Sequence, residues 1–409
     1  SDGSVTAAAT AGHVYSDTAT GTYTWGTLSS VTLTADPGDL EPTSGTGTPP
    51  DAGKTEYKWT PPGAITNGRT LVVAGGGGGG TDMGGGGGAG GLLASTTTNI
   101  AKEEQTITVG GGGTRGLNAS GSNQYVGGSG GNSSISGPSI TAIGGGGGGS
   151  ANENNGIANG VSGGSGGGGT GYGQTSGGTA GGAGTSGQGY AGASRDGNHY
   201  PGGGGGAGAA GSANPGHGGD GVENDILGTS YWWAGGGGGA GHSGSGGNGG
   251  KGGAGAGVGY SGGTPGTNDT NGITTGTAPT ETASYSNDTG GSAGKHTGGG
   301  GGGGEHNSTS DTSIMRGGRG GSGIVAIKFT VQASTVGIPG STAVPVETTT
   351  DAPSVTLVAT TEVATPTMNL DFTANMSTFP RTLKRYNGIT SSSIGARFNR
   401  THSKKKRVH

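Results

Sequence analysis

The side chains that could bind or react are few, and most of them interrupt long runs of glycine. One group is an aromatic triplet directly before a glycine tract, and another is the stretch SRDGNHYPGGGGG over 194–206. Stiff rings beside small hydrogen-bonding residues are the composition of antibody binding loops. We therefore expect contacts with a partner surface from Tyr231, Trp232, Trp233, Arg195, Asp196, Asn198, His199, Tyr200, Tyr172 and Tyr190. The alternative, left open at this point, is that the rings cover apolar surface at the ends of the glycine tracts.

No arrangement of residues predicts catalysis or a cofactor. Cysteine is absent, which excludes disulfides and thiolate metal sites. His296 and His306 flank a glycine tract, with Glu305 beside the second, and could share an ion, but solvent-exposed loop histidines are the simpler interpretation. The stretch GSAGKHT over 291–297 lacks the Ser or Thr that follows the lysine of a phosphate-binding loop. Carboxylates occur singly, not in the pairs of a glycosidase. We expect no enzyme, no catalytic residue, no cofactor and no metal site.

Charge is distributed unevenly along the chain. Nine Lys or Arg and no Asp or Glu fall between Arg381 and His409, although the whole chain has a net charge of −4. The remainder is therefore acidic, which argues against nucleic acid as the main partner. No run of 18 apolar residues is present, so we expect no membrane insertion.

Composition restricts how this chain can fold. Of 409 residues, 111 are glycine and only 11% are charged, while Phe, Trp and Met each number four. Disordered chains of low hydrophobicity usually carry a high net charge. An ordinary apolar core cannot be built from so few large side chains. If the chain is ordered, backbone hydrogen bonds must hold most of it together.

The chain divides by composition into three zones. Residues 1–55 predict a β-rich attachment segment and linker, with two short strands in GTYTWGTLSSVTLTAD; residues 332–409 predict a Thr/Val-rich segment with a basic tail. Residues 56–331 are the glycine-rich zone. Strands in TEYKWTPPG, RTLVVAG and QTITVGGGG open it, and GSGIVAIKFTVQ closes it. We expect Leu71–Val73 to pair with Ile324–Phe329.

Glycine tracts recur between these strands and alternate with variable polar loops. Collagen is excluded because glycine does not occupy every third position, and a flexible linker would not carry Tyr, Trp, His and Asn between tracts of similar length. Polyglycine in the polyproline II conformation can instead pack as parallel rods, because no Cβ separates the backbones. The fold class we expect is mostly irregular and all-β: a sandwich of polyglycine II rods bracketed by short strands, with little or no α-helix. The tracts of this scaffold begin at Gly75, Gly84, Gly144, Gly202, Gly235 and Gly298. Ala and Ser within tracts should mark outer rods.

The opening segment YKWTPPGAITNGRTLVVAGGGGGG, the following strand pair, and the closing GGRGGSGIVAIKF over 317–329 resemble the glycine-rich domain of bacteriophage and other viral tail or fibre proteins. The match covers about residues 56–331. Glycine tracts that alternate with variable loops are also similar, in architecture only, to the tail-fibre tip adhesins of T-even phages, which stack polyglycine II rods and display receptor-binding loops. The terminal zones match nothing in this pattern.

The resemblance implies an extracellular virion protein, part of a tail fibre or appendage. Its expected partners are other virion structural proteins and a host glycan or outer-membrane protein, and a homo-oligomer is left open. The alternative is a purely architectural capsid or tail decoration subunit. An ice-binding protein is a third interpretation, against which the absence of cysteine and the irregular loops count.

Overall fold

The computed structural model describes residues 53–61, 64–119, 122–124, 126–151, 159–171, 179–196, 200–241, 244–259, 266–280, 288–305 and 315–331, with short strands nearer both termini. These residues form strands, turns and extended segments without an α-helix, so the mostly irregular, all-β fold class is confirmed for the described part. Nothing in it is a helix long and apolar enough to cross a bilayer.

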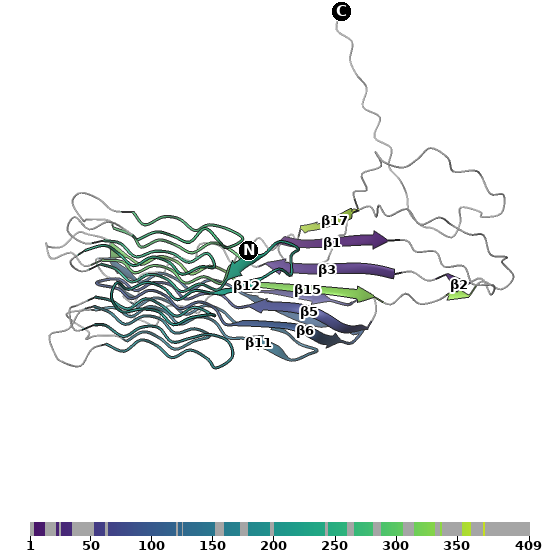
Figure 1. The fold of residues 1–409 in the computed structure, drawn as a ribbon, viewed down its shortest axis with the longest axis horizontal. Helices are drawn as coiled ribbons and strands as arrows, with labels where there is room; N and C mark the ends of the chain where they lie inside the picture. The colour runs from purple at the N-terminus through teal and green to yellow at the C-terminus, as the bar shows by residue number, and fades with distance from the viewer. Residues whose placement is uncertain are drawn as a thin grey trace, which may run out of the picture. The chain divides into compact units, whose positions relative to one another are not determined.

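Seven antiparallel strands form the larger sheet, shown in Figure 1. β15 pairs with β5 in the register Ile324↔Val73 and Ala326↔Leu71, which confirms the predicted pairing of the closing strand. The two ends of the glycine-rich zone are thereby fastened together. In sheet order the strands are β18 (Asp371–Phe372), β17 (Ser354–Thr360), β1 (Ser4–Gly12), β3 (Gly26–Thr34), β15 (Ile324–Val331), β5 (Ile65–Val73) and β6 (Leu92–Ile100).

The two strands predicted near the N-terminus are present as β2 (Thr22–Tyr23) and β3. They do not pair with each other. β2 pairs with β16 (Val336–Gly337), while β3 lies between β1 and β15 in the larger sheet.

A four-stranded sheet covers one face of β5 and β15. Its order is β11 (Ile140–Ala142), β10 (Ser133–Ile135), β7 (Gln105–Gly110) and β4 (Lys54–Trp59). Between the sheets lies an apolar cluster, in which the rings of Trp59 and Phe329 are 5.8 Å apart. This cluster takes alternate residues of the central strands, such as Val72, Val325 and Ile327.

The opposite face of β5 and β15 is covered by the hairpin of β12 (Val222–Asn224) and β13 (Tyr231–Trp233). Leu71, Val73 and Ile324 pack there against Trp233, whose side chain is fully buried. Both faces of the central strands are therefore buried, which is why their sequences, TLVVA and GIVAIKF, are nearly continuous apolar runs without polar alternation. A further small sheet contains β14 (Met315–Arg316), β8 (Leu117–Ala119) and β9 (Ser122–Gln124).

Beyond the sheet, the glycine-rich segments run side by side as rods (Figure 1). The rod over 74–80 leaves β5, turns at Thr81–Met83 and returns as the rod over 84–91. Ala74, Gly77 and Gly80 donate their backbone N–H groups to the carbonyls of Gly91, Gly88 and Gly85, respectively. Donors three residues apart thus face the same neighbour, as the threefold symmetry of polyglycine II requires.

The other hydrogen bonds of rod 74–80 show the same period. Donors from Gly75 and Gly78 reach rod 127–131, and those from Gly76 and Gly79 reach rod 317–321. Its carbonyls accept from three more rods, 113–116, 145–148 and 301–304. Three directions of N–H and three of C=O give six neighbours, so the rods pack as a hexagonal bundle whose backbone groups satisfy one another. The predicted first rod hairpin is confirmed.

The expectation that alanine marks outer rods is wrong at Ala89. This residue lies in rod 84–91, near the centre of the bundle, and its side chain is fully buried. Its methyl group packs in the same apolar cluster as Leu71 and Trp233. An inner rod can therefore carry a Cβ where it passes the apolar side chains of the sheet, but not where it faces other backbones. Ala207, which follows the inner rod 202–206, is half-buried and packs against the same apolar cluster.

Glycine inside the bundle should be irreplaceable. A Cβ added to Gly86 would overlap the carbonyl group of Gly237. We expect Gly86→Ala to lower the free energy of unfolding by about 3 kcal/mol or more, because the backbones must separate. Gly244→Ala is the matched control, since a Cβ there meets nothing within 4 Å, and it should leave stability unchanged or raise it by about 0.5 kcal/mol. Denaturant unfolding measures both; equal effects would contradict tight rod packing.

The apolar core predicts a pH effect through Tyr57. Burial of this phenol in the cluster between the sheets raises its pKa from 10.0 to about 12. The folded state therefore keeps a proton that the unfolded state loses, so this contribution to stability is complete below pH 10 and is lost as the pH rises towards 12. Melting temperatures across this range should fall more steeply for the natural chain than for Tyr57→Phe. Parallel curves would show that Tyr57 does not carry the effect.

Candidate functional site: the two ends of the rod bundle

Backbone hydrogen bonds between neighbouring rods show which end of each rod lies next to the larger sheet. Ala74 pairs with Gly91 where the rods join the larger sheet, and Gly80 pairs with Gly85 beside the turn at Thr81–Met83. We call these the sheet end and the distal end. The rods that flank the undescribed connections after 151, 171, 196, 241, 259, 280 and 305 reach those gaps at the distal end. These gaps in the described chain therefore open at the distal end, whereas the described turns over 185–188, 251–253 and 295–298 connect rods at the sheet end.

Part of the predicted contact set lies at the distal end. Gly202 accepts from Gly86 N, near the Thr81–Met83 turn, which places the neighbouring Tyr200 there. Arg195 lies beside it, with its backbone N–H donated to Thr179 O. Asp196 Oδ1 accepts from Tyr200 N at 3.1 Å, and Asp196 Oδ2 accepts from Asn214 Nδ2 at 2.9 Å. The aspartate thus shapes this loop. Tyr172, Asn198 and His199 lie outside the described residues.

The aromatic triplet lies at the opposite end. β13 immediately precedes rod 235–240, whose Ala240 donates to Gly84 O at the distal end, so Tyr231, Trp232 and Trp233 are at the sheet end. Tyr190 is also there, because its N–H is donated to Gly206 O, and 52% of its surface is exposed. The structure therefore does not bring the predicted contact residues together in one surface.

The three aromatic residues of β13 have different environments. Trp233 is fully buried, and its indole Nε1 donates to Asn224 O at 3.3 Å. Tyr231 is half-buried and meets the Trp233 ring edge-on, with ring centres 6.1 Å apart. Trp232 is half-buried on the outer face, with Lys251 Nζ 4.6 Å from its ring centre. For Trp233, the side chain covers apolar surface, as the alternative interpretation expected, and is not accessible to a partner.

The first glycines of the predicted scaffold tracts are all placed in rods or at their starts. In each case a Cβ would overlap an atom of a neighbouring segment, most often a carbonyl group. Gly298 also has a φ of 68°, and it forms the turn that leads into its rod. These positions are Gly75, Gly84, Gly144, Gly202, Gly235 and Gly298.

The suggested ion site between His296 and Glu305 is not formed. His296 lies in the turn before rod 298–304 and approaches Ser322 Oγ with Nδ1 at 3.2 Å. Glu305 follows the same rod at its distal end, so the two are separated by the length of a seven-residue rod, about 20 Å at 3.1 Å per residue. His306 lies outside the described residues. Within the described ranges, no three His, Asp or Glu residues are grouped as metal ligands.

A charged contact that the sequence reasoning missed joins the hairpin loop to the larger sheet. Arg69 of β5 donates from Nη2 to Asp225 Oδ1, in the loop after β12. The hydrogen bond and positive charge of Arg69 lower the pKa of Asp225. Neither residue belongs to a recognisable motif. The one local signal nearby is Asn67-Gly68, where Asn67 has a φ of 56° and interrupts the strand pattern.

One family comparison bears on this architecture. A family model described as a glycine-rich domain matches residues 50–258. The match begins close to the start of the predicted glycine-rich zone and contains β4, β5 and the rods over 74–80 and 84–91. It ends before the closing strand β15. A search of curated protein sequences finds no match.

The environments within the aromatic triplet predict unequal effects of substitution. Trp233→Ala should lower the free energy of unfolding by about 3–5 kcal/mol, because it leaves a cavity between hairpin and sheet. Trp232→Ala removes a half-exposed ring and its contact with Lys251, which should cost about 1 kcal/mol. Chemical denaturation of the two variants measures the difference. A small loss for Trp233→Ala would contradict the covering role.

Proposed function

The chain belongs to the glycine-rich domain family, and from this premise we propose that it is a structural component of a virion appendage that touches a host surface through the distal end of its rod bundle. The contact loops are those that connect the rods at that end. Its partners are a host glycan or outer-membrane protein and the other proteins of the particle, and its location is the virion surface.

The direction of the rods is the observation that carries this proposal. Loops at the distal end, away from the sheet and its apolar clusters, can vary without disturbing the backbone hydrogen bonds behind them. The sheet at the other end holds the first and last strands of the bundle in register. Arg195, Asp196 and Tyr200 occupy the distal end with polar and aromatic groups suited to adaptable contact. The rigid scaffold lowers the entropy that loops lose on binding.

Cell binding tests the proposal with one substitution at each end of the bundle. The purified full chain, labelled with a fluorophore, is applied to a panel of bacterial strains, and bound fluorescence is measured. Tyr200→Ala at the distal end should weaken binding about thirtyfold, as expected for an aromatic anchor. Tyr190→Ala, at the sheet end and 52% exposed, is the matched control and should bind normally.

Two outcomes would contradict the proposal. Binding lost equally in both variants would show that the distal end has no special role. Absence of binding to every strain, with the chain located by immunogold labelling in a regular lattice on virus particles, would favour the architectural decoration subunit instead.

A further inference from the structure

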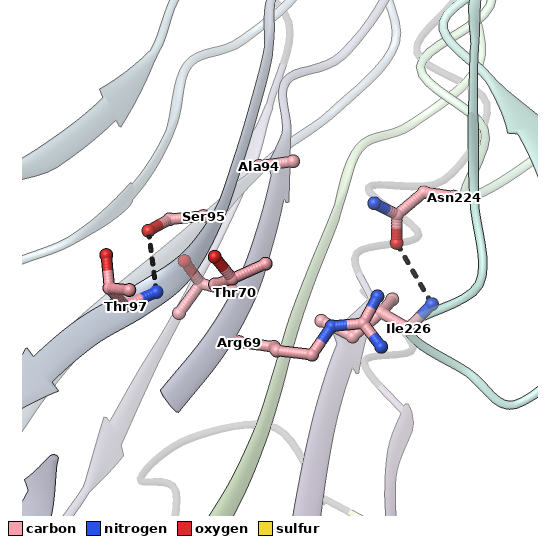
Figure 2. A pocket seen from close by; sticks show the side chains of 8 residues that line it. Arg69, Thr70, Ala94, Ser95, Thr97, Asn224 and Ile226 are labelled. Carbon is pink, nitrogen blue, oxygen red and sulfur yellow. Dashed lines mark hydrogen bonds between the residues drawn. The ribbon is translucent and has the colours of Figure 1, made fainter. Parts of the chain in front are cut away.

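A cleft at the sheet end lies between β5, β6 and the loop after β12, on the same side of the sheet as the hairpin. Its cavity volume is about 310 Å³, and its lining includes Arg69, Thr70, Ser95, Thr96, Asn224 and Ile226. Figure 2 shows Thr70, Ser95 and Thr97 on one side of the cleft and Asn224 with Ile226 on the other. The Arg69 side chain extends from the first side towards the second. The cleft therefore has hydroxyl groups, a guanidinium, an amide and one apolar wall.

A β-bulge opens this cleft. Gly68 pairs with Thr98 and Thr70 with Ser95, so three steps along β6 oppose two along β5. The extra residue lies in the stretch Thr96–Thr97, where Thr97 N–H is donated to Ser95 Oγ at 3.2 Å. Bulges at sheet edges redirect side chains and occur often beside binding sites. Here the bulge leaves Thr96 exposed at the edge of the cleft.

Several polar groups of the cleft keep hydrogen-bonding capacity. Asp225 is the sole hydrogen-bond partner of the Arg69 guanidinium among the described residues, and it uses only Nη2. Asn224 Oδ1 accepts from Ile226 N at 2.9 Å, which orients the amide so that Nδ2 has no partner in the described part of the chain. The exposed Thr96 hydroxyl has no hydrogen-bond partner among the described residues.

Two positive charges lie side by side here. Lys328 is the cross-strand neighbour of Arg69, and Arg69 is paired with the carboxylate of Asp225. The Arg69 side chain is 33% exposed, so it is held by the ion pair yet open to solvent. A planar guanidinium that is held in place but open to solvent can bind a carboxylate through two parallel N–H groups.

We propose that this cleft binds one unit of a saccharide that carries a carboxylate. The carboxylate meets the free N–H groups of Arg69, and ring hydroxyls exchange hydrogen bonds with Thr96 and Asn224 Nδ2. Ile226 contacts the C–H face of the sugar. A few placed polar groups beside an apolar wall is the usual composition of a small-molecule site. The cleft lies at the end opposite the distal loops, so this site does not depend on the host contact proposed above.

Titration of the full chain by calorimetry, with glucuronic acid and N-acetylneuraminic acid as probes, tests the site. Both should bind, and glucose should bind about tenfold more weakly, because it lacks the charge-assisted hydrogen bonds. Arg69→Gln should weaken binding of the acidic probes by about the same factor. Lys58→Gln, on the other sheet, is the control and should bind normally, since its side chain is already 56% exposed there.

A second variant guards against misfolding of Arg69→Gln. Thr96→Glu places a carboxylate at an exposed position beside the cleft and should exclude the acidic probes without altering the melting temperature. The proposal is overturned if neither acidic sugar binds, if glucose binds equally well, or if both variants retain full affinity. It is also overturned if acetate binds as tightly as the acidic sugars, because the site then recognises only an anion.

Discussion

Hydrogen bonds between neighbouring backbones, directed across the rods, are the interaction on which the rest of this structure depends. In an α-helix or a β-sheet, side chains project away from the direction of the backbone hydrogen bonds. In this bundle, N–H and C=O groups point outwards in all directions around the rod, so a central rod such as 74–80 is surrounded by six others. No space remains for a Cβ between them. Glycine is thus required by close approach, and the entropy that it loses is offset by complete pairing of its polar groups.

Such a bundle has little to define its register, because identical glycines can slide past one another. The sheet supplies that definition. β5 and β15 place specific side chains into two apolar clusters, one on each face, and the first and last rods continue directly from these strands. Ala89 and Trp233 extend one cluster onto the first rods. The small number of large apolar residues is therefore concentrated where it fixes the position of many backbone hydrogen bonds.

The bundle also separates two chemical environments. Its distal end carries the turn at Thr81–Met83 and the loop shaped by Asp196, which lie outside both apolar clusters. Its sheet end carries the β12–β13 hairpin, which is held by the Arg69–Asp225 ion pair and the buried Trp233. The bulge in β6 is at the same end. Both proposals use this separation: contact with a host surface at one end, and recognition of an acidic saccharide at the other.

The sequence by itself determined the class of structure. Composition left backbone hydrogen bonding as the main stabilising interaction, and the strands around Leu71–Val73 and Ile324–Phe329 marked where the rods begin and end. It could not determine which rods are neighbours, because a glycine tract carries no side chain to specify a partner. Tertiary structure alone therefore decided that Ala89 is central, that Tyr200 and Trp232 lie at opposite ends, and that Arg69 meets Asp225 across 156 positions of the chain. Pairing between distant backbones sets these positions, and no local pattern encodes it.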